Sequence, residues 1–436
     1  MTEISIRNRA TALIHNGKWG RWINRGVWTV TDRGLFALAN FGLNVVLARW
    51  MSLEAYGTFA LAFSVFIIIG SIQTALVSQP VLILGPGRYS GRYETYLGVV
   101  VKWQFVVCWI ASLGIAVTGA GFIEWGKRDT GIVLLALAVA GPFILLMWLM
   151  RKTGYAKLQA KGAAISGAVY MVLILAGTYL LNLLDVLTPA TALLMMAAAS
   201  LPVAIRLGIR QGVKLFEERL SGPFGREVAR EHWRYARWTI PAKILADIVT
   251  NAFVFALPIW VSLEATGAFR ALINLVLPMS FMASSLSVIL VPIMVRARVN
   301  NTMPEKLLVS LAFFMLTAIG YSAALILFDD EIVRLLYSDK YAAYSNLVWL
   351  IALLPIVQAP SNALSAGLFA MEKPRDVFWI TLAGASVAMT IGLGATYAFG
   401  LAGAIAGNVL SYLTMTVLLA LFLRSVLRKE RQHPPS

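Results

Sequence analysis

Long apolar stretches recur along the chain between Trp28 and Leu423, and short polar segments separate them. Each stretch is about 20 residues long, which is the length that an α-helix needs to cross a bilayer. Continuous runs of this length indicate helices, because a helix satisfies all of its own backbone groups in lipid. We therefore predict an all-α polytopic membrane protein. Its twelve spans are expected at 29–49, 57–80, 97–120, 131–150, 163–184, 189–206, 240–262, 267–295, 306–328, 347–370, 376–399 and 402–423.

The pattern repeats at a fixed offset of 210 residues. Residues 52–59 read SLEAYGTF and residues 262–269 read SLEATGAF, so six of eight positions are identical. The same register extends without a gap from Trp28 to Phe63, with eleven identities over 36 aligned positions. A fixed-period repeat indicates duplication of a whole structural unit. Because each copy holds six spans, we expect two six-helix bundles of the same orientation around a central path, which is typical of carriers.

The repeat divides the chain into five predicted regions. They are a basic N-terminal segment (1–28), an N-terminal six-helix bundle (29–206), a linker (207–238), a C-terminal six-helix bundle (239–423) and a basic tail (424–436). The N-terminal segment lacks the apolar core and the small-residue cleavage site of a signal peptide. Two interpretations remain for it: an interfacial segment on anionic lipid or a disordered tail.

The distribution of lysine and arginine predicts the orientation. If the N-terminus is inside, the cytoplasmic segments carry 28 of the 37 basic residues, the external turns carry five, and four lie within spans. Cytoplasmic segments of membrane proteins are enriched in lysine and arginine, so we expect both termini in the cytoplasm. The net charge of +16 follows mostly from this bias, and no nucleic-acid partner is expected.

Catalytic and cofactor motifs are not recognisable in the sequence. The three histidines lie far apart outside the spans, and Cys108 is the only cysteine. Residues 121–127 resemble the start of a phosphate-binding GxxxxGK loop, but Arg128 follows where the motif needs a hydroxyl for magnesium. We therefore expect no metal site, no cofactor and no enzymatic activity such as ATP hydrolysis.

The candidate binding residues are cations within or at the ends of spans, where a charged side chain costs at least about 2.5 kcal/mol at a helix centre. Arg33 and Lys243 occupy equivalent repeat positions near the cytoplasmic side, and Lys102 has a similar depth. Arg49 and Arg270 mark the external side. A cationic lining suits an anionic substrate. The alternative is that each side chain extends to its nearer interface.

Two acidic residues accompany these cations. Asp32 adjoins Arg33, and Asp247 follows Lys243 by four residues, which places the two on one helix face. Pairing with the cations is one role for these carboxylates. Carrying a coupling ion across the membrane is the other.

Three segments resemble one transporter family. Residues 48–57, ARWMSLEAYG, resemble the A-R-x-L-x-x-x-x-Y-G turn of the polysaccharide-transporter branch of the MOP exporter superfamily, the Wzx-like flippases. Residues 158–162, LQAKG, are similar to its L-Q-A-x-G loop, and residues 332–341, IVRLLYSDKY, to its external segment before the tenth helix. The resemblance implies two bundles forming a V around a cavity, as in MATE-like exporters.

The resemblance also implies a substrate, namely an undecaprenyl-pyrophosphate-linked oligosaccharide that is exported across the bacterial inner membrane for surface polysaccharide. Membrane lipids, glycosyltransferases and a polysaccharide polymerase are the expected partners. We assign Arg33, Lys102 and Lys243 to capture of the headgroup from inside, and Arg49 and Arg270 to the outward side. The rival functions are a multidrug or cation antiporter of the same superfamily and a membrane glycan polymerase or ligase.

Overall fold

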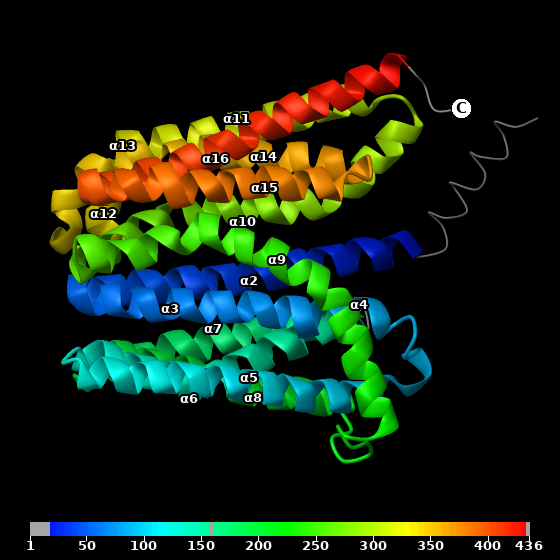
Figure 1. Ribbon diagram of the computed structural model, residues 1–436, viewed down its shortest axis with the longest axis horizontal. Helices are drawn as coiled ribbons and strands as arrows, with labels where there is room; N and C mark the ends of the chain where they lie inside the picture. The colour runs from blue at the N-terminus through cyan, green and yellow to red at the C-terminus, as the bar shows by residue number, and fades with distance from the viewer. Residues whose placement is uncertain (1–17, 157–159, 433–436) are drawn as a thin grey trace, which may run out of the picture.

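The computed structural model describes residues 18–156 and 160–432, and all of its regular elements there are helical (Figure 1). The side chains of residues 18–33 lie outside the described part, as do residues 1–17 of the predicted interfacial segment. The helices form two groups, the N-half and the C-half, which lie side by side in Figure 1.

The N-half begins with the longest helix of this group, and a π-helical turn interrupts its second span. Its helices are α2 (Lys18–Trp50), α3 (Leu53–Gln73), the π-turn η1 (Thr74–Ser78), α4 (Gln79–Leu84), the short η2 (Ser90–Arg92), α5 (Tyr93–Glu124), α6 (Arg128–Ala156), α7 (Ala160–Leu183) and α8 (Pro189–Arg210).

The C-half repeats this order with more breaks in its helices. Its elements are α9 (Pro223–Trp260), α10 (Leu263–Val299), α11 (Met303–Leu327), α12 (Asp329–Tyr337), η3 (Asp339–Leu347), α13 (Val348–Ile351), α14 (Leu353–Ala370), α15 (Pro374–Val387), the π-turn η4 (Ala388–Gly392) and α16 (Leu393–Gln432). The segment expected to be an external turn, 329–346, is itself helical as α12 and η3.

The described helices accommodate the predicted spans. Ten of them are long and apolar enough to cross a membrane. The last, Pro374–Arg428, is broken at Gly400, where φ is 56° and ψ is −130°, and so holds two of the predicted spans. Helix α2 adds the apolar stretch Gly34–Trp50. The all-α, multi-pass class predicted from the sequence is confirmed.

The repeated turns pack against each other where the two halves meet. A Cβ atom on Gly57 would lie 1.8 Å from the carbonyl oxygen of Leu263, and one on Gly267 would lie 2.3 Å from that of Leu53. These contacts are reciprocal at the 210-residue offset, so the pseudo-twofold axis of the repeat passes between them. Only glycine permits so close an approach of two backbones. We call this end of the molecule the turn end.

Further contacts join the halves at the turn end. The buried Tyr56 hydroxyl donates to Asn44 (3.2 Å) and accepts from Asn274 of the C-half (2.8 Å). Lys340 donates to the backbone carbonyls of Arg49 (2.9 Å) and Met51 (3.2 Å). Buried amide and phenol groups need such partners, so these hydrogen bonds stabilise the closed turn end.

The opposite end, which we call the linker end, is joined differently. Residues 211–222 connect α8 to α9, and the first part of α9 crosses the end of the N-half in Figure 1. There His232 bridges the hydroxyl of Tyr96 (2.7 Å) and the carbonyl of Leu76 (3.0 Å). Burial lowers the pKa of His232 to about 4, so the ring is neutral at pH 7.

The buried cores show the same asymmetry between the two ends. One apolar cluster fills the N-half and continues into the turn end of the C-half, through residues such as Phe269 and Leu272. A second cluster, which includes Met294 and Leu364, lies within the C-half alone. In Figure 1 the C-half tilts away from α2 toward the linker end. The halves are thus packed together at the turn end and diverge toward the linker end.

Candidate functional site

Three cations from the two halves gather where the halves diverge. Arg151 and Lys152 lie on α6 of the N-half, and Lys243 lies on α9 of the C-half. The charges of Lys243 and Arg151 both act on the ammonium group of Lys152. Like charges repel, so such a cluster would be stabilised by a nearby anion. We call these three residues the cation cluster.

The N-half holds its two cations through an aromatic and a hydroxyl contact. The Arg151 guanidinium lies 4.0 Å from the centre of the Phe36 ring, and only 7% of this residue is exposed. Lys152 donates to the Thr74 hydroxyl at 2.9 Å. Thr74 is the first residue of the π-turn η1, and π-turns often occur at functional sites. The aromatic face attracts the guanidinium through the negative electrostatic potential of the ring.

The C-half adds a carboxylate beside its cation. Asp247 follows Lys243 by one turn of α9, and their charges interact. Asp247 also interacts with the Ser71 hydroxyl of α3, so this carboxylate connects the halves. Position 33, the repeat equivalent of Lys243, lies on α2 three residues before Phe36. The side chains of Arg33 and Asp32 lie outside the described residues, and their roles stay predictions.

The other predicted cations lie elsewhere. Lys102 is partly buried on α5 and donates to the backbone carbonyl of Glu218 in the linker, at 2.5 Å. Arg49 donates to the carbonyl of Leu335 in α12, at 2.6 Å. Thus the structure does not bring these two residues together with Lys243. It gives each a structural contact, Lys102 with the linker and Arg49 across the turn end.

Arg270 lies inside the closed turn end. Its guanidinium is 5.3 Å from the centre of the Phe63 ring in the N-half, and its charge acts on Tyr56 and Tyr337. The buried Nε atom has no hydrogen-bond partner among the described residues. An unpartnered buried donor is unusual and calls for a partner that another state or ligand supplies. In this structure Arg270 is buried in the closed turn end, apart from the cation cluster.

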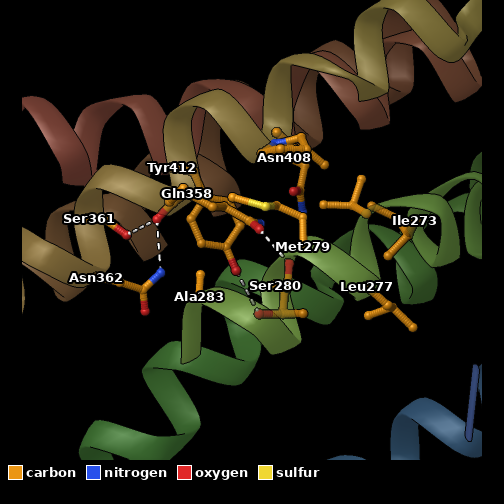
Figure 2. A pocket seen from close by; sticks show the side chains of 15 residues that line it. Ile273, Leu277, Met279, Ser280, Ala283, Gln358, Ser361, Asn362, Asn408 and Tyr412 are labelled. Carbon is orange, nitrogen blue, oxygen red and sulfur yellow. Dashed lines mark hydrogen bonds between the residues drawn. The ribbon is translucent and has the colours of Figure 1, made fainter. Parts of the chain in front are cut away.

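A polar cavity lies within the C-half (Figure 2). It has a volume of about 310 Å³ and is bounded by α9, α10, α14 and α16. Figure 2 shows amide and hydroxyl side chains directed toward it. The polar residues of the lining are Thr250, Ser280, Gln358, Ser361, Asn362, Asn408 and Tyr412. None of the lining residues is charged.

Sequence reasoning missed both features, for identifiable reasons. Arg151 and Lys152 were counted as cytoplasmic because the fourth span was ended at the first charge. The helix in fact continues to Ala156, past the last apolar residue of the stretch. The cavity residues are uncharged, so a search for charges within spans passes over them. The spacing of Gln358 and Asn362, four residues apart on one helix face, was the available signal.

The described residues contain no group of three or more His, Cys, Asp or Glu side chains that could hold a metal ion. The charged groups present favour binding of an anion by hydrogen bonds. Proton transfer to or from Asp247 is the other chemistry that this arrangement permits.

Comparison with known proteins identifies the fold of the chain. No family model matches the sequence, and no curated protein matches it. Among solved structures, the lipid II flippase MurJ in an inward closed conformation matches with a TM-score of 0.73, 13% identity and coverage of 92% of this chain and 87% of that one.

Two further structures of similar size match over almost the whole chain. An inward-facing multidrug resistance MATE transporter of the MOP superfamily has a TM-score of 0.68 and 15% identity, with coverage of 94% and 100%. A MOP superfamily transporter from Pyrococcus furiosus has a TM-score of 0.63 and 14% identity, with coverage of 94% and 95%. The chain therefore has the fold of MurJ and the MATE transporters of the MOP superfamily.

Proposed function

We propose that this protein is a flippase that moves a polyisoprenyl-pyrophosphate-linked oligosaccharide across a membrane by alternating access. The observation that carries the proposal is the cation cluster of Arg151, Lys152 and Lys243, contributed by both halves of a transporter fold at the end where they diverge. One of the structural matches is a lipid II flippase, which supports a lipid-linked substrate for this protein as well.

The chemistry of the cluster suits a pyrophosphate. This group carries two or more negative charges, and its oxygens accept short, charge-assisted hydrogen bonds from ammonium and guanidinium groups. Lys152 and Lys243 reach it from opposite halves, while the stacked Arg151 adds a fixed positive charge beneath them. We keep Arg33 as a further ligand from α2. Because both halves contact one anion, its capture would draw the halves together.

Transport then requires the turn end to separate. In our proposal the isoprenoid tail stays in lipid while the headgroup crosses between the halves. The hydrogen bond between Arg49 and the carbonyl of Leu335 breaks, and Arg270 becomes accessible to the headgroup. Asp247 is the candidate for ion coupling, because its charge interacts with that of Lys243 and its buried Oδ2 atom has no hydrogen-bond partner among the described residues.

We place this activity in the bacterial inner membrane with both termini in the cytoplasm, so that the linker end faces the cytoplasm. The product would serve O-antigen, capsule or exopolysaccharide assembly. Glycosyltransferases would supply the substrate and a polymerase would consume it. Lys102 then acts on substrate entry only through the linker that it binds.

The drug-cation alternative is weaker on electrostatic grounds. Among the described side chains, three cations and one carboxylate, Asp247, lie at the point where the halves diverge. A cationic drug would be repelled by this excess of positive charge. A polymerase or ligase would need catalytic groups, and the described residues around the cavity carry uncharged amides and hydroxyls.

The test is restoration of surface polysaccharide in a cell that lacks its own flippase, normalised to the amount of protein in the membrane. Each lost charged hydrogen bond is worth about 1.5–3 kcal/mol, or at least about tenfold in affinity. Lys152→Gln combined with Lys243→Gln should therefore abolish display of polysaccharide. Lys373→Gln, an exposed lysine in the turn before α15, is the matched control and should display normally.

Normal display by the double glutamine variant would contradict the proposal. It would mean that the two lysines only extend to the membrane interface. Export of cationic dyes by the wild-type protein, abolished by Asp247→Asn, would favour the antiporter instead.

A further inference from the structure

We infer that the polar cavity of the C-half is a binding site for an uncharged sugar, and that it receives the glycan while the cation cluster holds the pyrophosphate. The inference rests on the proposed function and adds to it which side chains recognise the glycan. It assigns the pyrophosphate to the cation cluster, which both halves contribute, and the glycan to the cavity of the C-half.

The lining has the hydrogen-bonding capacity that a sugar needs. Ser280 donates to Gln358 Oε1 (3.0 Å) and Ser287 donates to Asn362 Oδ1 (3.2 Å), which fixes both amide planes. Figure 2 shows Ser280, Gln358 and Asn362 around the same space. No described residue accepts a hydrogen bond from the amide nitrogen of Gln358, so its two donors are available to a ligand. Amides and hydroxyls both donate and accept, as the hydroxyl groups of a sugar do.

An aromatic wall completes the cavity. The hydroxyl of Tyr412 bonds to that of Thr250 at 3.1 Å, which fixes the ring on α16 against α9. Aromatic rings offer an apolar surface with a polar edge. At about 310 Å³ the cavity lies at the small end of the range for ligand sites, so it suits a single sugar unit.

Charge excludes the other classes of ligand. The lining has no cation to bind a phosphate and no carboxylate to bind a metal ion or a cationic drug. Asp247 is not part of the lining, and its charge acts on Lys243 and on Tyr412 at the edge of the cavity. The amide nitrogen of Gln358 would remain without a partner around an isoprenoid chain, which costs free energy. A neutral polar ligand is the class that fits.

The cavity and the cation cluster lie along one face of α9. Lys243, Asp247 and Thr250 are spaced by four and three residues, so they share this face. Seven residues of α-helix rise by about 10 Å. A pyrophosphate at Lys243 would therefore place the attached glycan, a few ångströms farther along, beside Thr250 and the cavity.

The repeat explains why the cavity exists only in the C-half. In the N-half, a Cβ on Gly70 would lie 3.0 Å from the ring of Trp148. At positions 210 residues later, Ser280 bonds to Gln358. The equivalent positions 70 and 148, and 280 and 358, are thus in contact in each half. The indole of Trp148 occupies in the N-half the space that stays open in the C-half. Likewise Arg151 and Lys152 correspond to Ser361 and Asn362.

The experiment measures binding of lipids to the purified protein in nanodiscs. The probes are undecaprenyl pyrophosphate and the same lipid carrying one glucose, galactose, N-acetylglucosamine or N-acetylgalactosamine. We expect at least one sugar to raise the affinity of the wild type above that for the sugar-free lipid. Gln358→Leu with Asn362→Leu should remove this gain, a loss of about tenfold for two hydrogen bonds. Affinity for the sugar-free lipid should not change, which also verifies folding.

A second variant fills the cavity instead. Gln358→Trp copies the N-half residue and should also remove the gain from the sugar, while Thr414→Val, on α16 outside the lining, should retain it. The inference is overturned if no sugar raises wild-type affinity, or if both cavity variants keep the gain. Failure of the wild type to bind any pyrophosphate lipid would overturn the proposed function, and this inference with it.

Discussion

The N-half and the C-half share a scaffold and fill it with opposite chemistry. In the N-half, aromatic rings form a column between α3 and α6, with ring centres 5.7 Å apart for Phe63 and Phe66 and 5.2 Å apart for Phe66 and Trp148. The positions 210 residues later carry Ile273, Val276 and Gln358. All three are smaller, and all three line the cavity of the C-half.

The two halves thus differ in how they fill equivalent space. The N-half is packed with rings and carries Arg151 and Lys152 at the edge of the aromatic column. The C-half has smaller side chains there and a neutral, hydrogen-bonding cavity. The difference teaches that two related bundles can keep one scaffold while their interiors differ in chemistry.

The largest expected effect comes from making the N-half resemble the C-half. Trp148→Gln removes the ring that packs on Phe66 and on Phe36, whose centre is 6.3 Å away. We expect a loss of about 3–5 kcal/mol in the free energy of unfolding, because the neighbouring rings cannot collapse into the space. Thermal unfolding in detergent measures it. Trp125→Gln, at a site that is 79% exposed, is the control and should change little. Equal stability of the two variants would show that the column is not structural.

The next effect tests the glycine contact at the turn end, where the two halves have the same residue. Gly57→Ala directs a methyl group at the carbonyl of Leu263, so the turn end should open. Overpacking of this kind costs about 1–3 kcal/mol, which shifts a two-state equilibrium by about 5–150-fold. Spin labels at Lys127→Cys and Asp329→Cys, in a Cys108→Ala background, report the distance between the halves.

The matched control for this change is Gly121→Ala, where a Cβ meets no atom within 4 Å. The distance between the labels should lengthen in Gly57→Ala only. An unchanged distance in Gly57→Ala would remove the glycine contact from the closure of the turn end.

The fold was predictable from the sequence because two strong periodic signals define it. Apolar length identified the spans, and the 210-residue repeat identified the halves. The ends of the helices were less predictable, since a charged residue does not terminate a helix. Helix α6 continues past Arg151, and α9 begins at Pro223, well within the segment expected to be the linker.

The site was predictable only in part. Lys243 and Asp247 were found because burial of charge in a span is costly. Lys102 and Arg49 satisfied the same criterion, but their contacts depend on distant segments, the linker and α12, whose positions follow from tertiary packing. The neutral cavity could not be predicted from charges within spans. It is formed where smaller side chains occupy the positions of large ones in the other half.

The smallest effect concerns the linker end, where His232 corresponds to Trp22 of the N-half. Burial lowers the pKa of His232 to about 4, below its ordinary 6.5, so its neutral form stabilises the fold above pH 6.5. This stability is lost as the pH falls toward 4. Between pH 7 and pH 5.5 we expect a loss of about 1 kcal/mol. Thermal unfolding of the wild type should depend on pH more steeply than that of His232→Gln, and equal slopes would exclude the histidine as the cause.

The central claim, that both halves bind one pyrophosphate, is tested most directly by the lipid preference of the purified protein. Binding of undecaprenyl pyrophosphate and of the uncharged alcohol undecaprenol should be compared in nanodiscs at one salt concentration. We predict that the wild type prefers the pyrophosphate by at least about tenfold, and that Lys152→Gln and Lys243→Gln each reduce the preference by a similar factor. An unchanged preference in the double variant, or equal binding of both lipids by the wild type, would contradict the account.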